Sequence, residues 1–266
     1  MGTQAHTVAT KEGWRWLTFG FTLFKKNPAG MLSLTVSYFG VVLFLSLLIP
    51  FAGSVLAAML SPGLNAGMMT ACRMVARGLP ITPSILFSAF LEENKRFLKP
   101  FLRMGALYAL LVLLVSLLAS SFGSVDMELV MQDGKPDPAE MMPQMASRLL
   151  VMAVAYVPVM MLFWYAPALL LWHEMPVGKA LFFSFLAVWR NRSAFLFYAL
   201  GWFLWLMTCV SFFTLIALLL PLPGFLAAAL NFIMVVGIFS LTLCTFYPSY
   251  LSVFEPKELG FDGTGG

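Results

Sequence analysis

Residues 31–74 read MLSLTVSYFGVVLFLSLLI-PFAG-SVLAAMLSPGLNAGMMTACRM, and this stretch decides the fold class. Its two apolar segments, Met31–Ile49 and Phe51–Met74, are separated by a turn that begins at Pro50 and ends at Gly53. Each segment is long enough to cross a bilayer, because a helix needs about 20 apolar residues to span the hydrocarbon core. Proline and glycine so close together are typical of a tight turn. The stretch therefore predicts a transmembrane hairpin.

Apolar segments of the same length recur along the rest of the chain. A second turn rich in proline and glycine begins at Pro221 and joins the last two of them. The composition agrees, since 61% of the residues are hydrophobic and 11% are charged, against about 45–50% and about 25% in soluble domains. We predict an all-α membrane protein with six transmembrane helices. The four further spans are Phe101–Phe122, Leu149–Trp172, Ala194–Leu220 and Gly224–Tyr250.

The distribution of Lys and Arg predicts the orientation in the membrane. All of these residues except Lys135 and Arg148 lie in the N-terminal segment, in the connections after the second and fourth spans, or in the tail 251–266. The remaining long loop, 123–147, is acidic. Because Lys and Arg concentrate in cytoplasmic loops, we expect both termini in the cytoplasm and the acidic loop, as a mobile or partly helical cap, outside.

Three short segments that precede the first, third and fifth spans resemble one another. Residues 17–27 and 181–191 align without gaps, and residues 85–96 show the same order of apolar residues followed by Asn and basic residues. An apolar stripe that ends in cations suits a helix lying in the membrane interface. Thr82-Pro83 suits the start of such a helix, with Thr as N-cap and Pro in the first turn. We therefore predict three parallel repeats, each an interfacial amphipathic helix plus a transmembrane hairpin, at 11–76, 82–172 and 177–250.

The second, fourth and sixth spans contain proline, whereas the others contain none. Proline removes a backbone donor, and a carbonyl freed in lipid needs another partner, so broken helices tend to face protein or a wet cavity. Gly63 and Gly67 have the spacing that lets two helices approach closely, and the isolated amides Asn65 and Asn231 favour bonds between helices. We expect these helices to form an inner layer, with simple kinks as the alternative. Its breaks and polar groups would be Pro62, Gly63, Asn65, Gly67, Pro158, Pro167 and Asn231.

Basic residues at the predicted cytoplasmic ends of the helices are candidates for contact with lipid head groups or a ligand, because long cationic side chains reach to the interface. These residues are Arg73, Lys95, Arg96, Arg103, Arg190 and Arg192.

Acid–base chemistry would depend on His173 and Glu174 at the end of the fourth span. Adjacent helical residues point about 100° apart, so anchoring at the interface is the alternative. The chain has no HExxH, GxSxG or CxxC sequence, so we predict no catalytic residues, no metal site and no cofactor. Without a basic face interleaved with aromatic residues, no nucleic-acid partner is predicted.

The motifs KEGWRW (11–16), KNP (26–28), SPGL (61–64) and GM (67–68) resemble those of a family of uncharacterised proteobacterial inner-membrane proteins. The repeated hairpin is also similar to that in the membrane domain of some glycerophosphodiester phosphodiesterases. The resemblance covers most of the chain and implies a bacterial inner-membrane location. It implies no activity, because the soluble catalytic domain of those phosphodiesterases has no counterpart here.

Three classes of function remain. A non-catalytic factor that binds membrane lipids, another membrane protein or a second copy of itself predicts a dry, packed centre. A transporter or channel for a small amphiphile or lipid predicts a polar path between the second, fourth and sixth spans. A membrane-embedded enzyme would rest on His173 and Glu174 alone. The absence of a catalytic motif favours the first class.

Overall fold

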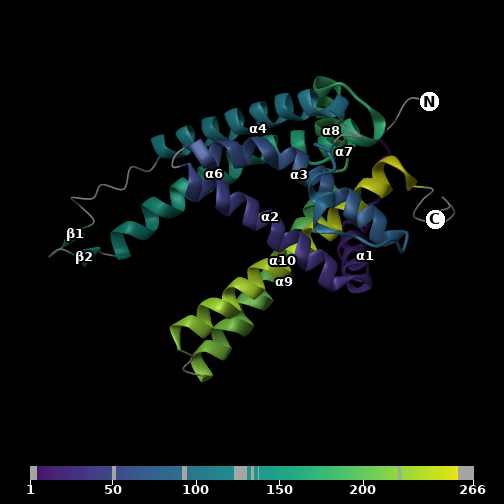
Figure 1. Ribbon diagram of the computed structural model, residues 1–266. Helices are drawn as coiled ribbons and strands as arrows, with labels where there is room; N and C mark the ends of the chain where they lie inside the picture. Colours follow the sequence, from purple (N-terminus) through teal and green to yellow (C-terminus); the bar gives the residue numbers. More distant parts are fainter. Residues whose placement is uncertain are drawn as a thin grey trace.

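The computed structural model describes residues 5–49, 52–91, 95–122, 131–132, 135–136, 138–220 and 223–256 (Figure 1). Apart from two antiparallel two-residue strands, every element in these ranges is helical. The elements are α1 (Glu12–Lys26), α2 (Pro28–Leu48), α3 (Ala52–Ala76), the 3₁₀ helix η1 (Pro83–Phe87), α4 (Lys95–Ser121), β1 (Met131–Gln132), β2 (Lys135–Pro136), α6 (Pro138–Phe163), α7 (Ala166–His173), α8 (Val177–Arg190), α9 (Arg192–Leu219) and α10 (Gly224–Phe254).

Six helical stretches are long and apolar enough to cross a membrane, which confirms the predicted number of spans. Their ends differ from the predicted ones by several residues, as is usual for helix boundaries. Parts of three predicted features fall outside the described residues, namely the tips of both Pro–Gly turns and, in the acidic loop, residues 123–130, 133–134 and 137. The described remainder of the loop contains the two short strands and the start of α6 at Pro138. The stretches are Pro28–Leu48, Ala52–Ala76, Lys95–Ser121, Met145–His173, Arg192–Ile216 and Gly224–Phe254.

The three helical hairpins lie together at one end and diverge toward their tips. In Figure 1 the hairpin of α9 and α10 points away from the hairpin of α4 and α6. The segment before α1 and the last turn of α10 meet at the shared end, where the His6 amide donates to the Val253 carbonyl at 2.8 Å. We call this shared end the basic end, because it carries the basic residues that flank the spans.

The packed core lies toward the basic end. Of the most apolar window in each span, 56% is buried in α3 but only 6% in α9. In α7 the residues from Ala166 to Leu170 are buried, and in the last part of α10 every residue from Leu243 to Phe254 is buried except the half-buried Phe246. Burial is therefore concentrated in α3, in α7 and in the second half of α10, where an inner layer was expected. The side chains of α6 and of the first half of α10 are largely exposed.

The fourth span is broken between α6 and α7, and a side chain from α8 fills the break. Pro167 lies in the first turn of α7, where its missing amide costs no helical bond. The Ser184 hydroxyl donates to the Met161 carbonyl at 2.8 Å and accepts from the Tyr165 amide at 2.9 Å. In an unbroken helix these two backbone groups would bond each other. A serine inserted in this way is one of the recognised causes of a kink.

Gly63 and Gly67 of α3 pack against the segment before α4 and not against another span. A Cβ at Gly67 would collide with the carbonyl oxygens of Ile85 and Leu86, and a Cβ at Gly63 would collide with the Phe90 ring. The second of the three expected interfacial helices is only the short helix η1, whose Leu86 is fully buried. The Thr82 side chain makes no capping bond, because its hydroxyl is paired with Ser84 at 2.8 Å.

Candidate functional site

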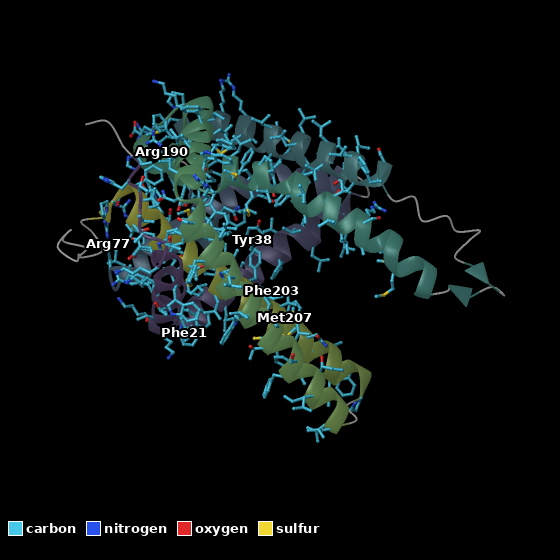
Figure 2. The ribbon with its side chains drawn as sticks, turned by 180° about the vertical axis from the view of Figure 1, so that it is seen from behind. Phe21, Tyr38, Arg77, Arg190, Phe203 and Met207 are labelled. Atoms are coloured by element: carbon cyan, nitrogen blue, oxygen red, sulfur yellow. The ribbon has the colours of Figure 1, made fainter. Side chains whose placement is uncertain are left out.

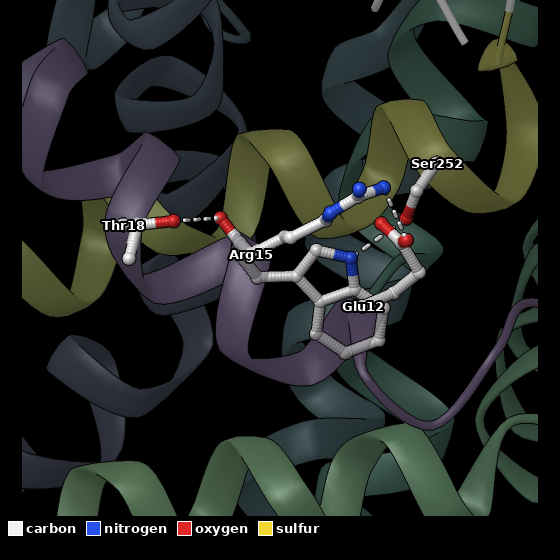
Figure 3. A network of polar contacts seen from close by, with 5 residues as sticks. Glu12, Arg15, Thr18 and Ser252 are labelled. Atoms are coloured by element: carbon white, nitrogen blue, oxygen red, sulfur yellow. Dashed lines mark hydrogen bonds and ion pairs between the residues drawn. The ribbon is translucent and has the colours of Figure 1, made fainter. Parts of the chain in front are cut away.

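Helix α1 lies across α9 and α10 in close backbone contact with both. A Cβ at Gly13 would meet the Ala194 carbonyl of α9, and a Cβ at Gly20 would meet the backbone of Thr245 in α10. Trp16 is 1% exposed. Its indole nitrogen donates to the Ser252 hydroxyl at 2.8 Å (Figure 3). The amphipathic pattern predicted for α1 therefore buries one stripe against this hairpin and leaves the other face exposed.

A carboxylate and a guanidinium meet on the flank of α1. Arg15 forms an ion pair with Glu12 at 2.8 Å, and Glu12 as a whole residue is only 8% exposed. The Thr18 hydroxyl donates to the Arg15 carbonyl at 3.1 Å (Figure 3), and the Thr22 hydroxyl donates to the Thr18 carbonyl at 3.0 Å. These four residues, with Trp16, Phe19 and Pro248, line a hollow of about 230 Å³. We call it the polar hollow.

A larger groove of about 570 Å³ lies between α1, α9 and α10 and has mostly apolar walls. Thr18 and Thr22 line this groove as well as the polar hollow, so the two spaces adjoin along α1. We call it the aromatic groove. Its aromatic walls are Trp14, Phe21, Trp202 and Trp205.

Exposed cations lie over aromatic rings close to where the spans begin. The Lys25 ammonium is 4.5 Å from the Phe21 ring centre, and the Arg192 guanidinium is 5.7 Å from the Trp189 ring centre. The Arg96 guanidinium is 4.7 Å from the ring of Phe97. Such pairs combine an apolar body with a charged tip, which suits a membrane interface.

Five of the six predicted basic contact residues are exposed. Figure 2 shows one of them, Arg190, toward the same end of the molecule as another basic residue, Arg77. The five are Lys95, Arg96, Arg103, Arg190 and Arg192.

Arg73 is placed differently from the prediction. Its guanidinium is 3.7 Å from the Glu255 carboxylate and 4.9 Å from the ring centre of Trp172. Glu255 also accepts a hydrogen bond from the Tyr250 hydroxyl at 3.1 Å. Arg73 therefore joins the ends of α3, α7 and α10, and it is a poor candidate for a lipid contact.

His173 and Glu174 do not form a joint acid–base site. His173 hydrogen-bonds the Tyr250 hydroxyl and lies 3.7 Å from Glu255. Glu174 has a left-handed backbone conformation (φ 52°) and pairs with Arg96 at 2.6 Å. Among the described residues, no cluster of three or more His, Cys, Asp or Glu could hold a metal ion.

Two of the three asparagines that recur beside basic residues, Asn27 and Asn191, hold backbone segments together, and the third, Asn94, lies outside the described residues. Asn191 is 1% exposed. Its side chain accepts from the Val8 amide at 2.8 Å and donates to the carbonyls of His6 at 3.0 Å and Ala187 at 2.9 Å. Asn27 caps α2 by accepting from the Gly30 amide at 3.0 Å. The recurring sequence pattern singled out these asparagines, but it did not predict their partners. Two of the three partners of Asn191, Val8 and His6, lie far from it in the sequence.

The remaining predicted inner-layer residues differ in burial. Pro62 and Pro167 are buried, whereas Pro158 is exposed. Asn231 is also exposed and donates to the Ala227 carbonyl of its own helix at 2.9 Å. The expected bond from Asn231 to another helix is therefore wrong. Asn65 is half-buried on α3 and forms no hydrogen bond to the described part of the chain.

Comparison with known proteins identifies one relative along nearly the whole chain. The chain is 34% identical over 262 residues to a probable inner membrane protein of Burkholderia thailandensis, and the match covers 95% of this chain and 94% of the relative. No family model and no solved structure matches the chain. With its six candidate spans, the chain belongs to the family of this probable inner membrane protein and is a multi-pass protein of the bacterial inner membrane.

Proposed function

We propose that this protein is a non-catalytic membrane factor that binds phospholipid head groups at its basic end, in the cytoplasmic leaflet. The observation that carries the proposal is the set of exposed cation–aromatic pairs on α1 and where α8 meets α9, such as Lys25 with Phe21 and Arg192 with Trp189. The cytoplasmic leaflet is rich in anionic lipids, which attract Lys and Arg close to the membrane.

The order of elements supports a threefold organisation of this binding surface. Helix α1 precedes the hairpin of α2 and α3, and α8 precedes the hairpin of α9 and α10. The segment containing η1 occupies the corresponding place before α4, although it packs beneath α3. In the proposed arrangement, three parallel units each bring cationic residues to the same leaflet, with both termini in the cytoplasm.

The interior favours binding over transport. The Tyr165 hydroxyl donates to the Ser249 carbonyl at 3.3 Å, and the Tyr198 and Thr245 hydroxyls are paired at 2.6 Å. A polar path needs groups that remain open to a passing solute or to water, whereas these buried groups bond each other. Satisfied polar networks make a core rigid.

The test compares two variants that lose the same charge at opposite ends. Arg190→Gln/Arg192→Gln removes two cations from the basic end, and Lys135→Gln/Arg148→Gln removes two from the acidic loop and the start of the fourth span. Binding of phosphatidylglycerol to each purified protein is measured by native mass spectrometry. At roughly 1 kcal/mol for each basic residue near an anionic surface, the first pair weakens binding by up to about 30-fold. The second pair leaves it unchanged.

Equal affinity in all three proteins would contradict the proposal. A doubled mass without bound lipid would instead indicate self-association of the chain.

A further inference from the structure

We propose that the polar hollow and the aromatic groove together form a binding site for one phospholipid whose head group carries both a phosphate and a primary ammonium. This inference rests on the proposed lipid-binding function and adds a selective site to it. The lipid would come from the surrounding bilayer, with its head group at Glu12 and Arg15 and one hydrocarbon chain in the groove.

The charges of the polar hollow are complementary to such a head group. Among the described residues that line it, Arg15 is the one basic residue and Glu12 is the one acidic residue. A guanidinium binds phosphate oxygens well, and a carboxylate accepts several hydrogen bonds. A purely anionic head group would meet Arg15 but would also lie against the carboxylate of Glu12. A head group with both charges satisfies the two residues at once.

The hydroxyl groups of the hollow favour a hydrogen-bond donor as the ligand. The hydroxyl protons of Thr18 and Thr22 are already donated to backbone carbonyls of their own helix, at 3.1 and 3.0 Å. What remains on each hydroxyl oxygen is the capacity to accept. A primary ammonium has three donors, whereas a quaternary ammonium has none.

The groove extends from this hollow in the direction that a hydrocarbon chain requires. Its walls continue from Thr18 to Trp205 and Thr208 on α9 and to Leu241 on α10, which lie toward the tip of that hairpin. Trp205 is 45% exposed and Trp14 is 53% exposed, so the groove can receive a chain from the bilayer. Its volume of about 570 Å³ falls within the roughly 300–1,000 Å³ of small-molecule sites.

Helices α9 and α10 are spaced so that the groove remains open between them. Helix α1 packs closely against each of them, because its Gly13 contacts α9 and its Gly20 contacts α10. The cavity lies where these three helices meet. The groove is therefore part of the way in which α1 docks. It is not a shallow dent on a single helix.

The experiment measures which lipid the intact protein retains. The protein is purified in mild detergent, and phosphatidylethanolamine, phosphatidylcholine and phosphatidylglycerol with identical chains are added in equal amounts before native mass spectrometry. Glu12→Gln tests the head-group contact, with Glu174→Gln as the matched control at an exposed ion pair. Thr208→Phe narrows the groove, with Met207→Phe as the matched control on the neighbouring position, which does not line the groove.

We expect the wild type to retain phosphatidylethanolamine about ten-fold better than phosphatidylcholine, the size of one charge-assisted hydrogen bond. Glu12→Gln should abolish this preference, Thr208→Phe should lower the retention of all three lipids at this site, and both controls should behave as the wild type. Equal retention of phosphatidylethanolamine and phosphatidylcholine by the wild type would overturn the inference. A preference that survives Glu12→Gln, or retention that survives Thr208→Phe, would also overturn it. None of these three results would affect binding of phosphatidylglycerol through Arg190 and Arg192, so a failure of this inference can be told from a failure of the proposed function.

Discussion

The basic end and the hairpin tips of this molecule are held together in different ways. At the basic end, large side chains such as Trp16, Tyr165 and Tyr250 are almost fully buried, and glycines bring the backbones of neighbouring helices together. At the tip of the last hairpin, Leu219 is 69% exposed and Phe225 is 73% exposed. Lipid tails are as apolar as these side chains, so the tips gain little by packing on protein. The comparison indicates that small residues and hydrogen bonds at one end hold the bundle together.

The largest expected effect comes from blocking a backbone approach between α3 and α4. In Gly105→Leu the new side chain would overlap the Met59 carbonyl, so the two helices would have to separate. The loss should reach or exceed the roughly 3 kcal/mol at the top of the usual range for overpacking. Thermal loss of the monomer peak in size-exclusion chromatography measures it. Gly40→Leu is the control, because a Cβ at that exposed position meets nothing within 4 Å. Equal loss in both variants would show that packing at Gly105 is not special.

A smaller but clear effect is expected where Asn191 connects the N-terminal segment to α8. Asn191→Ala removes three hydrogen bonds, and backbone groups left unpaired cost about 1–3 kcal/mol each. Asn231→Ala is the same substitution at an exposed amide that bonds only its own helix. The thermal midpoint of the first variant should fall well below that of the second. If the two midpoints coincide, the bonds of Asn191 do not stabilise the basic end.

Ser184→Ala should have an intermediate effect, because it empties the hydroxyl bridge between Met161 and Tyr165. One backbone pair loses its partner, so we expect destabilisation of about 1–2 kcal/mol. Hydrogen exchange at the Tyr165 amide should also become faster. Ser37→Ala removes an exposed hydroxyl that bonds its own helix and should change neither quantity. Unchanged exchange at Tyr165 in Ser184→Ala would argue against the inserted hydroxyl.

The smallest effect is expected at the exposed ion pair of Arg96 and Glu174. Both side chains are more than half exposed, at 65% and 58%, and such pairs contribute about 0–1 kcal/mol. A double-mutant cycle of Arg96→Gln and Glu174→Gln should give coupling in that range. The same cycle at Arg73 and Glu255, which are 24% and 20% exposed, should give a larger value. The reverse order would contradict the role of Arg73 in joining the ends of α3, α7 and α10.

The spans were predictable because they depend on local composition. Runs such as Met31–Ile49 exceed the length that crosses a bilayer, and Pro167 predicted a break that the structure places between α6 and α7. What the sequence did not reveal are contacts between distant segments. Nothing local to Ser184 indicates that its hydroxyl enters another helix, and nothing local to Arg73 indicates Glu255 as its partner.

The candidate site was predictable only in its residue types. Basic residues beside aromatic ones suggested interfacial contacts, and the exposed side chains of Arg190 and Arg192 agree with that pattern. The pairing of Glu12 with Arg15 has ordinary helical spacing, but its location beside an aromatic groove depends on how α1 crosses α9 and α10. Asn231 was misjudged because an amide in an apolar helix can bond its own backbone as readily as another helix.

The proposed lipid binding depends most on one assignment, which is that the packed basic end lies in the cytoplasmic leaflet. Membrane-impermeant maleimide labelling tests it with Thr10→Cys, near the start of α1, and Ser147→Cys, in the first part of α6. Both positions are exposed, and Cys209 is replaced by Ser to remove the one native cysteine that is not fully buried. In intact spheroplasts we predict labelling of Ser147→Cys alone, and labelling of both after lysis. Labelling of Thr10→Cys in intact spheroplasts, with Ser147→Cys protected, would place the basic end outside and contradict the account.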